Sequence, residues 1–122
     1  MPQGPVAVSR LGADETSREP QNIRAVRWLL DQPGGRVVVV TPQRDFSSAS
    51  LRRLVADPRV LHHTWRGFHP GGFVGQRVIY AWPDRKHLND GWGAEADALV
   101  VIEWNEDETA EWIAAVRPIE LL

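Results

Sequence analysis

The stretch Arg36-Val37-Val38-Val39-Val40-Thr41-Pro42 decides the fold of this 122-residue chain. Four consecutive β-branched apolar residues predict a strand that is covered on both faces, because a strand with one wet face would alternate with polar residues. Gly34-Gly35 precedes the run and is typical of a helix end. Pro42 ends it, since proline has no N–H to give to a sheet. The pattern therefore predicts a central strand of an α/β sheet.

Helices and strands alternate on both sides of this run. Apolar spacing and end signals predict helices over Pro20–Gln32, Phe46–Ala56, Pro83–Gly91 and from Asn105 onward, and strands over Val60–Trp65, Arg77–Trp82, Asp97–Trp104 and Arg117–Leu122. Such alternation is typical of an open, mostly parallel sheet with helices on both faces. We therefore expect a small three-layer α/β domain with about 4–5 strands.

The first part of the chain carries weaker signals. Residues 1–18 contain scattered prolines, glycines and charges and are expected to form a weakly ordered lead, with Val6-Ala7-Val8 as a short edge strand. A single α/β domain is expected over residues 19–122. In the first helix Ile23, Val26 and Leu30 share one face, with Leu29 beside it, and predict its buried stripe. Thr16 to Glu19 have the spacing of a capping box.

The composition favours a cytoplasmic protein. The sequence has no cysteine, which excludes disulfides and thiolate metal sites, and no apolar run reaches the roughly 20 residues of a membrane span. Met1 to Arg10 lack the charged and apolar parts of an export signal. All but one of the 14 basic residues are arginines, which suits an accessory protein of a GC-rich bacterium or phage.

The order of segments also resembles a known family. The strand ending in Thr41-Pro42, the run Ala81-Trp82-Pro83-Asp84-Arg85 and the run Ala98-Leu99-Val100-Val101-Ile102-Glu103 are similar to the middle of the first RecA-like domain of superfamily-two helicases. The resemblance implies a degenerate RecA-like or Rossmann-like layout, strand ends that touch nucleic acid, and Glu103 as the Walker B acid. The Gly-Lys-Ser/Thr loop that wraps a triphosphate is absent, so we expect no ATP hydrolysis.

Ligands of open parallel sheets bind beyond the carboxyl ends of the strands. This rule brings Thr41–Asp45, Trp65–His69, Trp82–His87 and Glu103–Asp107 to one rim. Tryptophan and arginine are enriched at protein interfaces, and both also stack on single-stranded nucleic acid. The predicted binding residues on this rim are Arg44, Trp65, Arg66, Trp82, Arg85 and Trp104. We expect the indole of Trp82 to be exposed there.

Three carboxylates at strand ends raise the alternative of a metal site. Asp45, Asp84 and Glu103 are candidates to converge on a divalent ion, as in phosphodiester-cleaving enzymes. The other interpretation is that Asp45 and Asp84 cap helices and that Glu103 is a surface acid. The histidines form no pair with the compact spacing of a helical zinc site; they are His62, His63, His69 and His87. We predict no metal site and no cofactor.

Taken together, the residues favour a non-catalytic binding or adaptor domain that recognises a protein partner, or a second copy of itself, through the Trp/Arg-rich rim. The alternative is a nucleic-acid-binding accessory protein, with Arg44, Arg66 and Arg85 on phosphates and Trp65 or Trp82 stacked on bases. A metal-dependent phosphoesterase is a third hypothesis. No membrane partner is expected.

Overall fold

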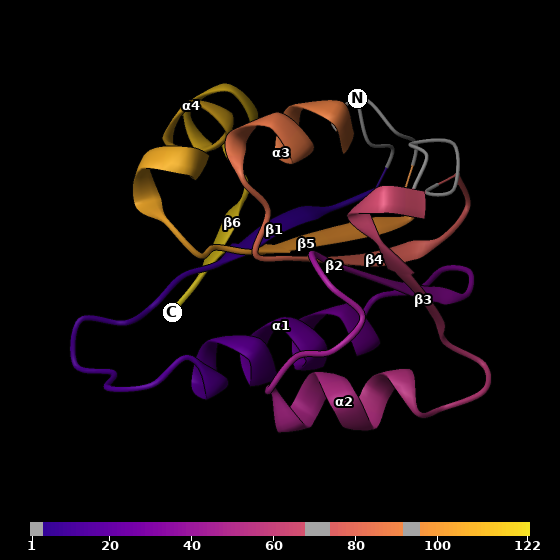
Figure 1. Ribbon diagram of the computed structural model, residues 1–122. Coiled ribbons are helices and arrows are strands. Elements are labelled where there is room, and N and C mark those ends of the chain that lie inside the picture. The colour runs from indigo at the N-terminus through magenta and orange to yellow at the C-terminus, as the bar shows by residue number, and fades with distance from the viewer. Residues whose placement is uncertain (1–3, 68–73, 92–95) are drawn as a thin grey trace.

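The strands of this protein form one all-parallel sheet in a computed structural model that describes residues 4–67, 74–91 and 96–122 (Figure 1). The strand order is β3-β2-β4-β5-β1-β6. The strands are β1 (Val6–Ser9), β2 (Val37–Thr41), β3 (Leu61–Thr64), β4 (Arg77–Ala81), β5 (Ala98–Ile102) and β6 (Ile119–Leu121). The predicted α/β class is confirmed, with six strands in the described residues instead of about 4–5.

The valine run is the inner strand that its composition predicts. β2 pairs with β3 on one side and with β4 on the other, and all five of its residues are buried. Val38 and Val40 pack in a cluster with Trp112, whereas Val39 packs in a second cluster with Leu29. Figure 1 shows the reason, since α3 and α4 cover one face of the sheet and α1 and α2 cover the other.

The first strand corrects the prediction of an edge strand in a weakly ordered lead. β1 pairs with both β5 and β6, and Ala7, Val8 and Ser9 are fully buried. The sheet therefore includes residues before 19. A three-residue apolar run between prolines and glycines gave too short a pattern to indicate an inner position, and the strand beside it, β6, comes from the far end of the chain.

The helices match the predicted segments, with shorter bounds. They are α1 (Glu19–Leu30), α2 (Ala49–Val55), α3 (Arg85–Gly91) and α4 (Glu106–Val116), with a short 3-10 turn, η1, at Trp65–Gly67. Ser48 caps α2 by accepting the N–H of Leu51, and Asn105 caps α4 by accepting the N–H of Asp107. None of the helices in the described part of the chain is long and apolar enough to span a membrane.

The structure confirms Leu29 but not Leu30 in the predicted buried stripe of α1. Ala25 and Leu29 are fully buried against the sheet, whereas Leu30 is 50% exposed. Ile23 and Val26 are half-buried and line the groove between α1 and α2. The sequence favoured the aliphatic face, but the face that meets the sheet includes buried polar residues, which a search for apolar spacing passes over.

The predicted capping box at the start of α1 is also wrong. Arg18 occupies the cap position and its side chain makes no capping bond. The carboxylate of Glu19 reaches α2 instead, where it accepts hydrogen bonds from the Ser48 hydroxyl (2.7 Å) and the Ser50 N–H (2.8 Å). Glu19 therefore supplies the negative charge at the start of α2 and ties the two helices together.

The connections between strands create two places where a ligand can enter the carboxyl edge of the sheet. The chain leaves β2 toward α2 on one face and leaves the neighbouring β4 toward α3 on the other (Figure 1). It likewise leaves β1 toward α1 and the neighbouring β5 toward α4. Crevices form where neighbouring connections diverge in this way, so the fold itself indicates where a site lies.

Val39→Asp tests the central position of β2. The side chain is fully buried among apolar residues, so an unpaired carboxylate there should cost about 3–5 kcal/mol, a large part of a typical stability of about 5–15 kcal/mol. The same change at Val74, which is 55% exposed, is the matched control. Urea unfolding should show a large loss for the first variant only, and equal midpoints would contradict the placement of the core.

Candidate functional site

A cleft of about 450 Å³ opens at the carboxyl edge of the sheet. Its residues follow the four neighbouring strands β3, β2, β4 and β5 or lie in the first turn of α4. We call it the aromatic cleft; it is lined by Pro42, Trp65, Trp82, Pro83, Asp84, Trp104, Asn105 and Glu108. The three tryptophans that the sequence placed on one rim therefore do meet around one hollow.

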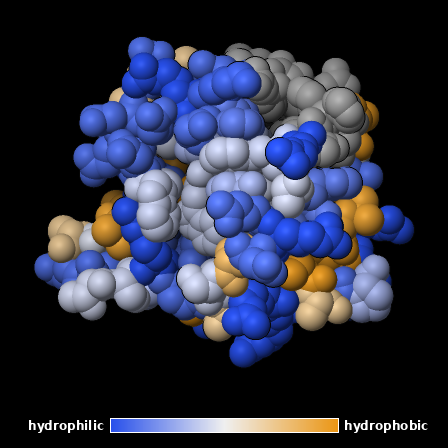
Figure 2. Space-filling view, in the orientation of Figure 1, coloured by the Kyte–Doolittle hydropathy of each residue, from blue (hydrophilic) through white to orange (hydrophobic). Residues whose placement is uncertain are grey.

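Trp104 is the exposed member of the three. Its side chain is 55% exposed, whereas Trp82 and Trp65 are half-buried. This corrects the expectation that Trp82 carries the exposed indole. In the space-filling view, pale residues of intermediate hydropathy lie across the middle of the face that carries the ends of β4 and β5 (Figure 2).

Trp82 has an unusual backbone. Its φ of 54° is in the left-handed region, which costs a residue with a side chain about 1–2 kcal/mol. Its N–H still donates to the Ile102 carbonyl at 2.9 Å and so extends the ladder between β4 and β5. The indole packs edge-on against Phe46 at 5.9 Å and against Trp104 at 6.5 Å. These contacts fix the indole between the aromatic cleft and a second hollow.

The second hollow has about 520 Å³ and a more polar lining. Trp82 and Trp104 separate it from the aromatic cleft, because both indoles line both spaces. We call it the polar cleft; its other lining residues are Ser17, Arg18, Glu19, Asn22, Phe46, Ser47, Ser48 and Ala49. The carboxylate of Glu19 already accepts the Ser48 hydroxyl and the Ser50 N–H here, so these two donors at the start of α2 are occupied.

Arg18 is a site residue that sequence reasoning missed. Its guanidinium lies 4.5 Å from the centre of the Trp104 ring, in a cation–π contact, and donates to the Glu103 carbonyl at 3.1 Å. Arg18 stands just before α1 and its partners follow β5, so the pairing of β1 with β5 and the packing of α1 on β5 bring them together. No local sequence pattern carries this contact.

On the opposite side of the aromatic cleft, Trp65 is held by a histidine and an aspartate. The His87 ring stacks on Trp65 with centres 3.9 Å apart, and its Nδ1 lies 2.7 Å from Asp84. Asp84 also accepts the His87 N–H at the start of α3, as expected for a helix cap. Burial raises the pKa of Asp84, but the hydrogen bonds from His87 outweigh it and the pKa is lowered. Asp84 is therefore an anion at neutral pH.

The three predicted arginines do not line the aromatic cleft among the residues that the structure describes. Arg44 and Arg66 are exposed, and Arg44 lines a separate hollow beside the end of α2. Arg85 is nearer: its backbone N–H donates to Glu108 at 2.7 Å and its guanidinium donates to the Asp107 carbonyl at 2.9 Å. The predicted interleaving of tryptophan and arginine thus holds along the rim but not inside the cleft.

The carboxylates proposed for a metal lie apart. Asp45 is exposed near Arg44 and does not cap α2, a role taken by Ser48. Asp84 bonds to His87, and Glu103 is buried, which corrects the interpretation of Glu103 as a surface acid. Over residues 4–67, 74–91 and 96–122 no three acidic or histidine side chains form a metal-binding group.

The histidines have other roles where they are described. His62 Nε2 lies 2.8 Å from the Thr41 hydroxyl, and its ring packs edge-on against Phe46. Burial, with smaller effects of Arg44 and His63, lowers the pKa of His62, so its ring is neutral at pH 7. His69 falls outside the described residues.

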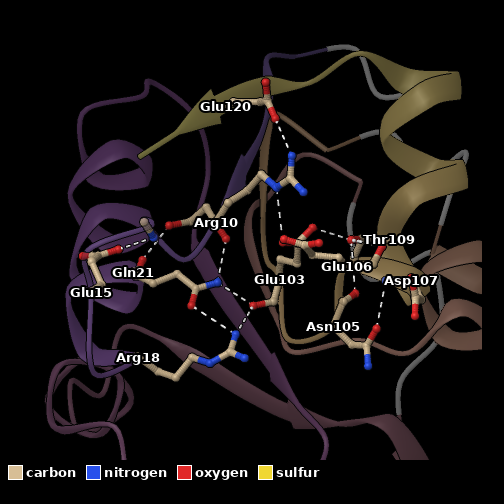
Figure 3. Close-up of polar contacts among 12 residues, drawn as sticks. Arg10, Glu15, Arg18, Gln21, Glu103, Asn105, Glu106, Asp107, Thr109 and Glu120 are labelled. Atoms are coloured by element: carbon tan, nitrogen blue, oxygen red, sulfur yellow. Dashed lines mark hydrogen bonds and ion pairs between the residues drawn. The ribbon is translucent and has the colours of Figure 1, made fainter.

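Glu103 organises a polar cluster beneath the clefts (Figure 3). Its carboxylate accepts hydrogen bonds from Arg10 Nε at 3.2 Å and from the Thr109 hydroxyl. Its carbonyl accepts from Arg18 and from the Gln21 amide. A single residue therefore attaches the end of β5 to the end of β1, to α1 and to α4. The side chain that the helicase resemblance identifies as the Walker B acid is bonded to Arg10 and Thr109.

Comparison with known proteins found no matching family model, no similar curated protein and no similar solved structure.

Glu103→Gln tests the structural role of this carboxylate. Loss of the charge opposite Arg10, in a buried position, should lower the free energy of unfolding by about 1–3 kcal/mol. Glu106→Gln is the matched control, since Glu106 is an exposed acid in the first turn of α4 and surface changes stay within about 0.5 kcal/mol. Equal urea midpoints for the two variants would show that Glu103 is not part of the framework.

Glu15 fixes the segment between β1 and α1, which contains Arg18, by bonding to both Gly12 and Arg24. Its carboxylate accepts from Arg24 at 2.7 and 2.8 Å and from the Gly12 N–H at 2.6 Å. The Arg24 hydrogen bonds, followed by the Gly12 N–H, lower the pKa of Glu15 from 4.5 to about 2.

A carboxylate with a lowered pKa stabilises the folded state above its unfolded pKa, and this contribution is lost as the pH falls. For Glu15 the loss should occur between pH 4.5 and about 2. Glu15→Gln should therefore unfold with a shallower dependence of the urea midpoint on pH across this window. Asp57, whose pKa is also lowered to about 2, contributes equally to the loss of stability at low pH in the wild type and in Glu15→Gln. Parallel pH profiles would contradict the assignment.

Proposed function

We propose that this protein is a non-catalytic binding domain that recognises a partner protein through the aromatic cleft. The observation that carries the proposal is the meeting of Trp65, Trp82 and Trp104, from three strand ends, around one hollow in which Trp104 stays 55% exposed. Tryptophan is the residue most enriched among the side chains that dominate protein interfaces. An exposed indole at the mouth of a concave apolar site suits a partner's side chain.

The chemistry of the lining favours binding over catalysis. Among its described residues, Asp84 and Glu108 are the ionisable groups, and each already accepts a hydrogen bond from a neighbouring backbone N–H. A nucleophile next to a base is the usual sign of covalent catalysis, and these lining residues contain no serine, threonine, lysine or histidine.

Nucleic acid is the less favoured partner. Bases would stack well on three indoles, but phosphates would meet the carboxylates of Asp84 and Glu108, while Arg44 and Arg66 lie elsewhere. Nucleic-acid affinity depends on cations placed along the phosphate path. The same surface suits a protein chain, which carries apolar and polar groups in alternation.

Selection of peptides tests the proposal. A random peptide library displayed on phage should yield binders to the immobilised wild-type domain, and Trp104→Ala should weaken them by about 2 kcal/mol, the usual contribution of an interface anchor. Leu30→Ala is the matched control, because Leu30 is 50% exposed on α1 and does not line the cleft. Both variants should keep the wild-type free energy of unfolding, measured with urea, to within about 0.5 kcal/mol.

Two results would contradict the proposal. One is a set of binders that Trp104→Ala leaves unchanged. The other is tighter binding of a single-stranded DNA oligonucleotide at low salt, lost in the same variant, which would establish the nucleic-acid alternative. Sedimentation of the wild type and of Trp104→Ala separates a second copy of this chain from a foreign partner, since only self-association depends on the concentration of the domain alone.

A further inference from the structure

We infer that the aromatic cleft binds a cationic side chain of the partner, an arginine held between indole faces with Asp84 and Glu108 as its counter-ions. This inference rests on the proposed function and names the chemistry of the group recognised. It depends on three features of the described residues: the sign of the charge in the cleft, the crowding of acids at the start of α4, and the contact that an indole of this cleft already makes with a guanidinium.

The charge inside the aromatic cleft is negative. Asp84 and Glu108 line it, and among the described residues no arginine or lysine does. The pKa of Asp84 is lowered by His87, so its charge persists near neutral pH. Each carboxylate uses one oxygen to accept a backbone N–H, Asp84 from His87 and Glu108 from Arg85. A guanidinium between the two would find acceptors on both sides and would compensate both charges.

The start of α4 adds to this bias. A helix N-terminus normally attracts an anion through its free N–H groups. Here Asn105 accepts the N–H of Asp107, and the first turn carries Glu106, Asp107 and Glu108. Three carboxylates in one turn exceed the partial positive charge of the helix end, so this end disfavours a phosphate. Strongly hydrophilic residues cover the region of α4 in the space-filling view (Figure 2).

Two neighbouring cations do not fill the cleft. The Arg85 guanidinium donates to the Asp107 carbonyl, and Arg85 does not line the hollow. Lys86 is exposed, and its charge contributes only a minor part to the lowered pKa of Asp84. They reduce the negative field around the cleft but occupy no position between the indoles.

An indole of this site already binds a guanidinium. Arg18 lies 4.5 Å from the centre of the Trp104 ring, and it lines the polar cleft but not the aromatic one. Trp104 lines both. The aromatic cleft therefore presents the same indole, together with Trp82 and Trp65, to a cation from outside the chain. Arginine suits such flat surfaces better than lysine, because its planar guanidinium stacks on rings while its edge bonds to carboxylates.

A set of short peptides tests this inference on the intact domain. The probes are blocked alanine pentapeptides with a central arginine, citrulline, norleucine or glutamate. Citrulline keeps the shape of arginine without its charge. The indole N–H signals of Trp65, Trp82 and Trp104 in NMR spectra report binding, and Trp28, which lies on α1 and does not line the aromatic cleft, is the internal control. The arginine peptide should shift the three signals saturably and leave Trp28 unchanged.

The matched variants are Glu108→Gln and Glu111→Gln. Both remove one charge from α4, but only Glu108 lines the cleft, and glutamine keeps an oxygen for the Arg85 N–H. Glu108→Gln should weaken the arginine peptide about threefold at low salt and less at high salt, as expected for a partly exposed charge pair. Glu111→Gln should have no effect. Asp84→Asn is a second variant of the same kind, should Glu108→Gln prove unstable.

The outcomes separate this inference from the proposed function. One outcome is that the norleucine or citrulline peptide binds as well as the arginine peptide, with all binding lost in Trp104→Ala. In that case the cleft binds protein side chains but the cationic inference is overturned. If the glutamate peptide binds best, the cleft prefers an anion and the cationic inference is overturned. If no peptide moves the indole signals, both the cationic inference and the proposed function fail.

Discussion

The parallel pairing of strands buried on both faces is the constraint from which the site follows. Because every strand in the sheet runs the same way, the residues that follow them gather at one edge. Burial of β2, β4 and β5 on both faces leaves no polar face along the strands on which a site could form. Chemistry is therefore confined to the strand ends, where Trp65, Trp82 and Trp104 follow β3, β4 and β5, with the end of β2 between the first two.

The buried polar residues beneath this edge explain how the two ends of the chain support it. Ser9 and Gln21 exchange two hydrogen bonds, and Gln21 continues to the Glu103 carbonyl. Arg10 then joins Glu103 to Glu120 of β6 (Figure 3). Each of these groups finds a partner, and satisfied polar networks fix a unique arrangement where apolar packing alone tolerates slippage. The position of Trp104, the next residue after Glu103, depends on this cluster.

Sequence alone predicted the framework well where the pattern was strong. The composition of the valine run and of the segment Ala98–Ile102 predicted buried strands. The alternation of strands and helices then predicted that the three tryptophans lie at the carboxyl edge of the sheet. The sequence did not predict the inner position of β1, the exposure of Leu30 on α1, or the contact of Arg18 with Trp104. Each of these depends on pairing between residues distant in the chain. The resemblance to helicases stays a prediction.

The energetics of the rim favour a role for the cleft in binding. Trp82 keeps a left-handed backbone at a cost of about 1–2 kcal/mol. The indole N–H groups of Trp65 and Trp82 are buried and meet no acceptor among the described residues, and a buried donor without a partner costs about 1–3 kcal/mol. Trp104 adds exposed apolar surface beside them. Unfavourable features of this kind gather at functional sites, because the rest of the fold supplies the stability that holds them in place. Here Trp82 directly follows the buried strand β4, and Trp104 directly follows Glu103 at the end of β5, so the packed framework holds these unfavourable features in place at the cleft.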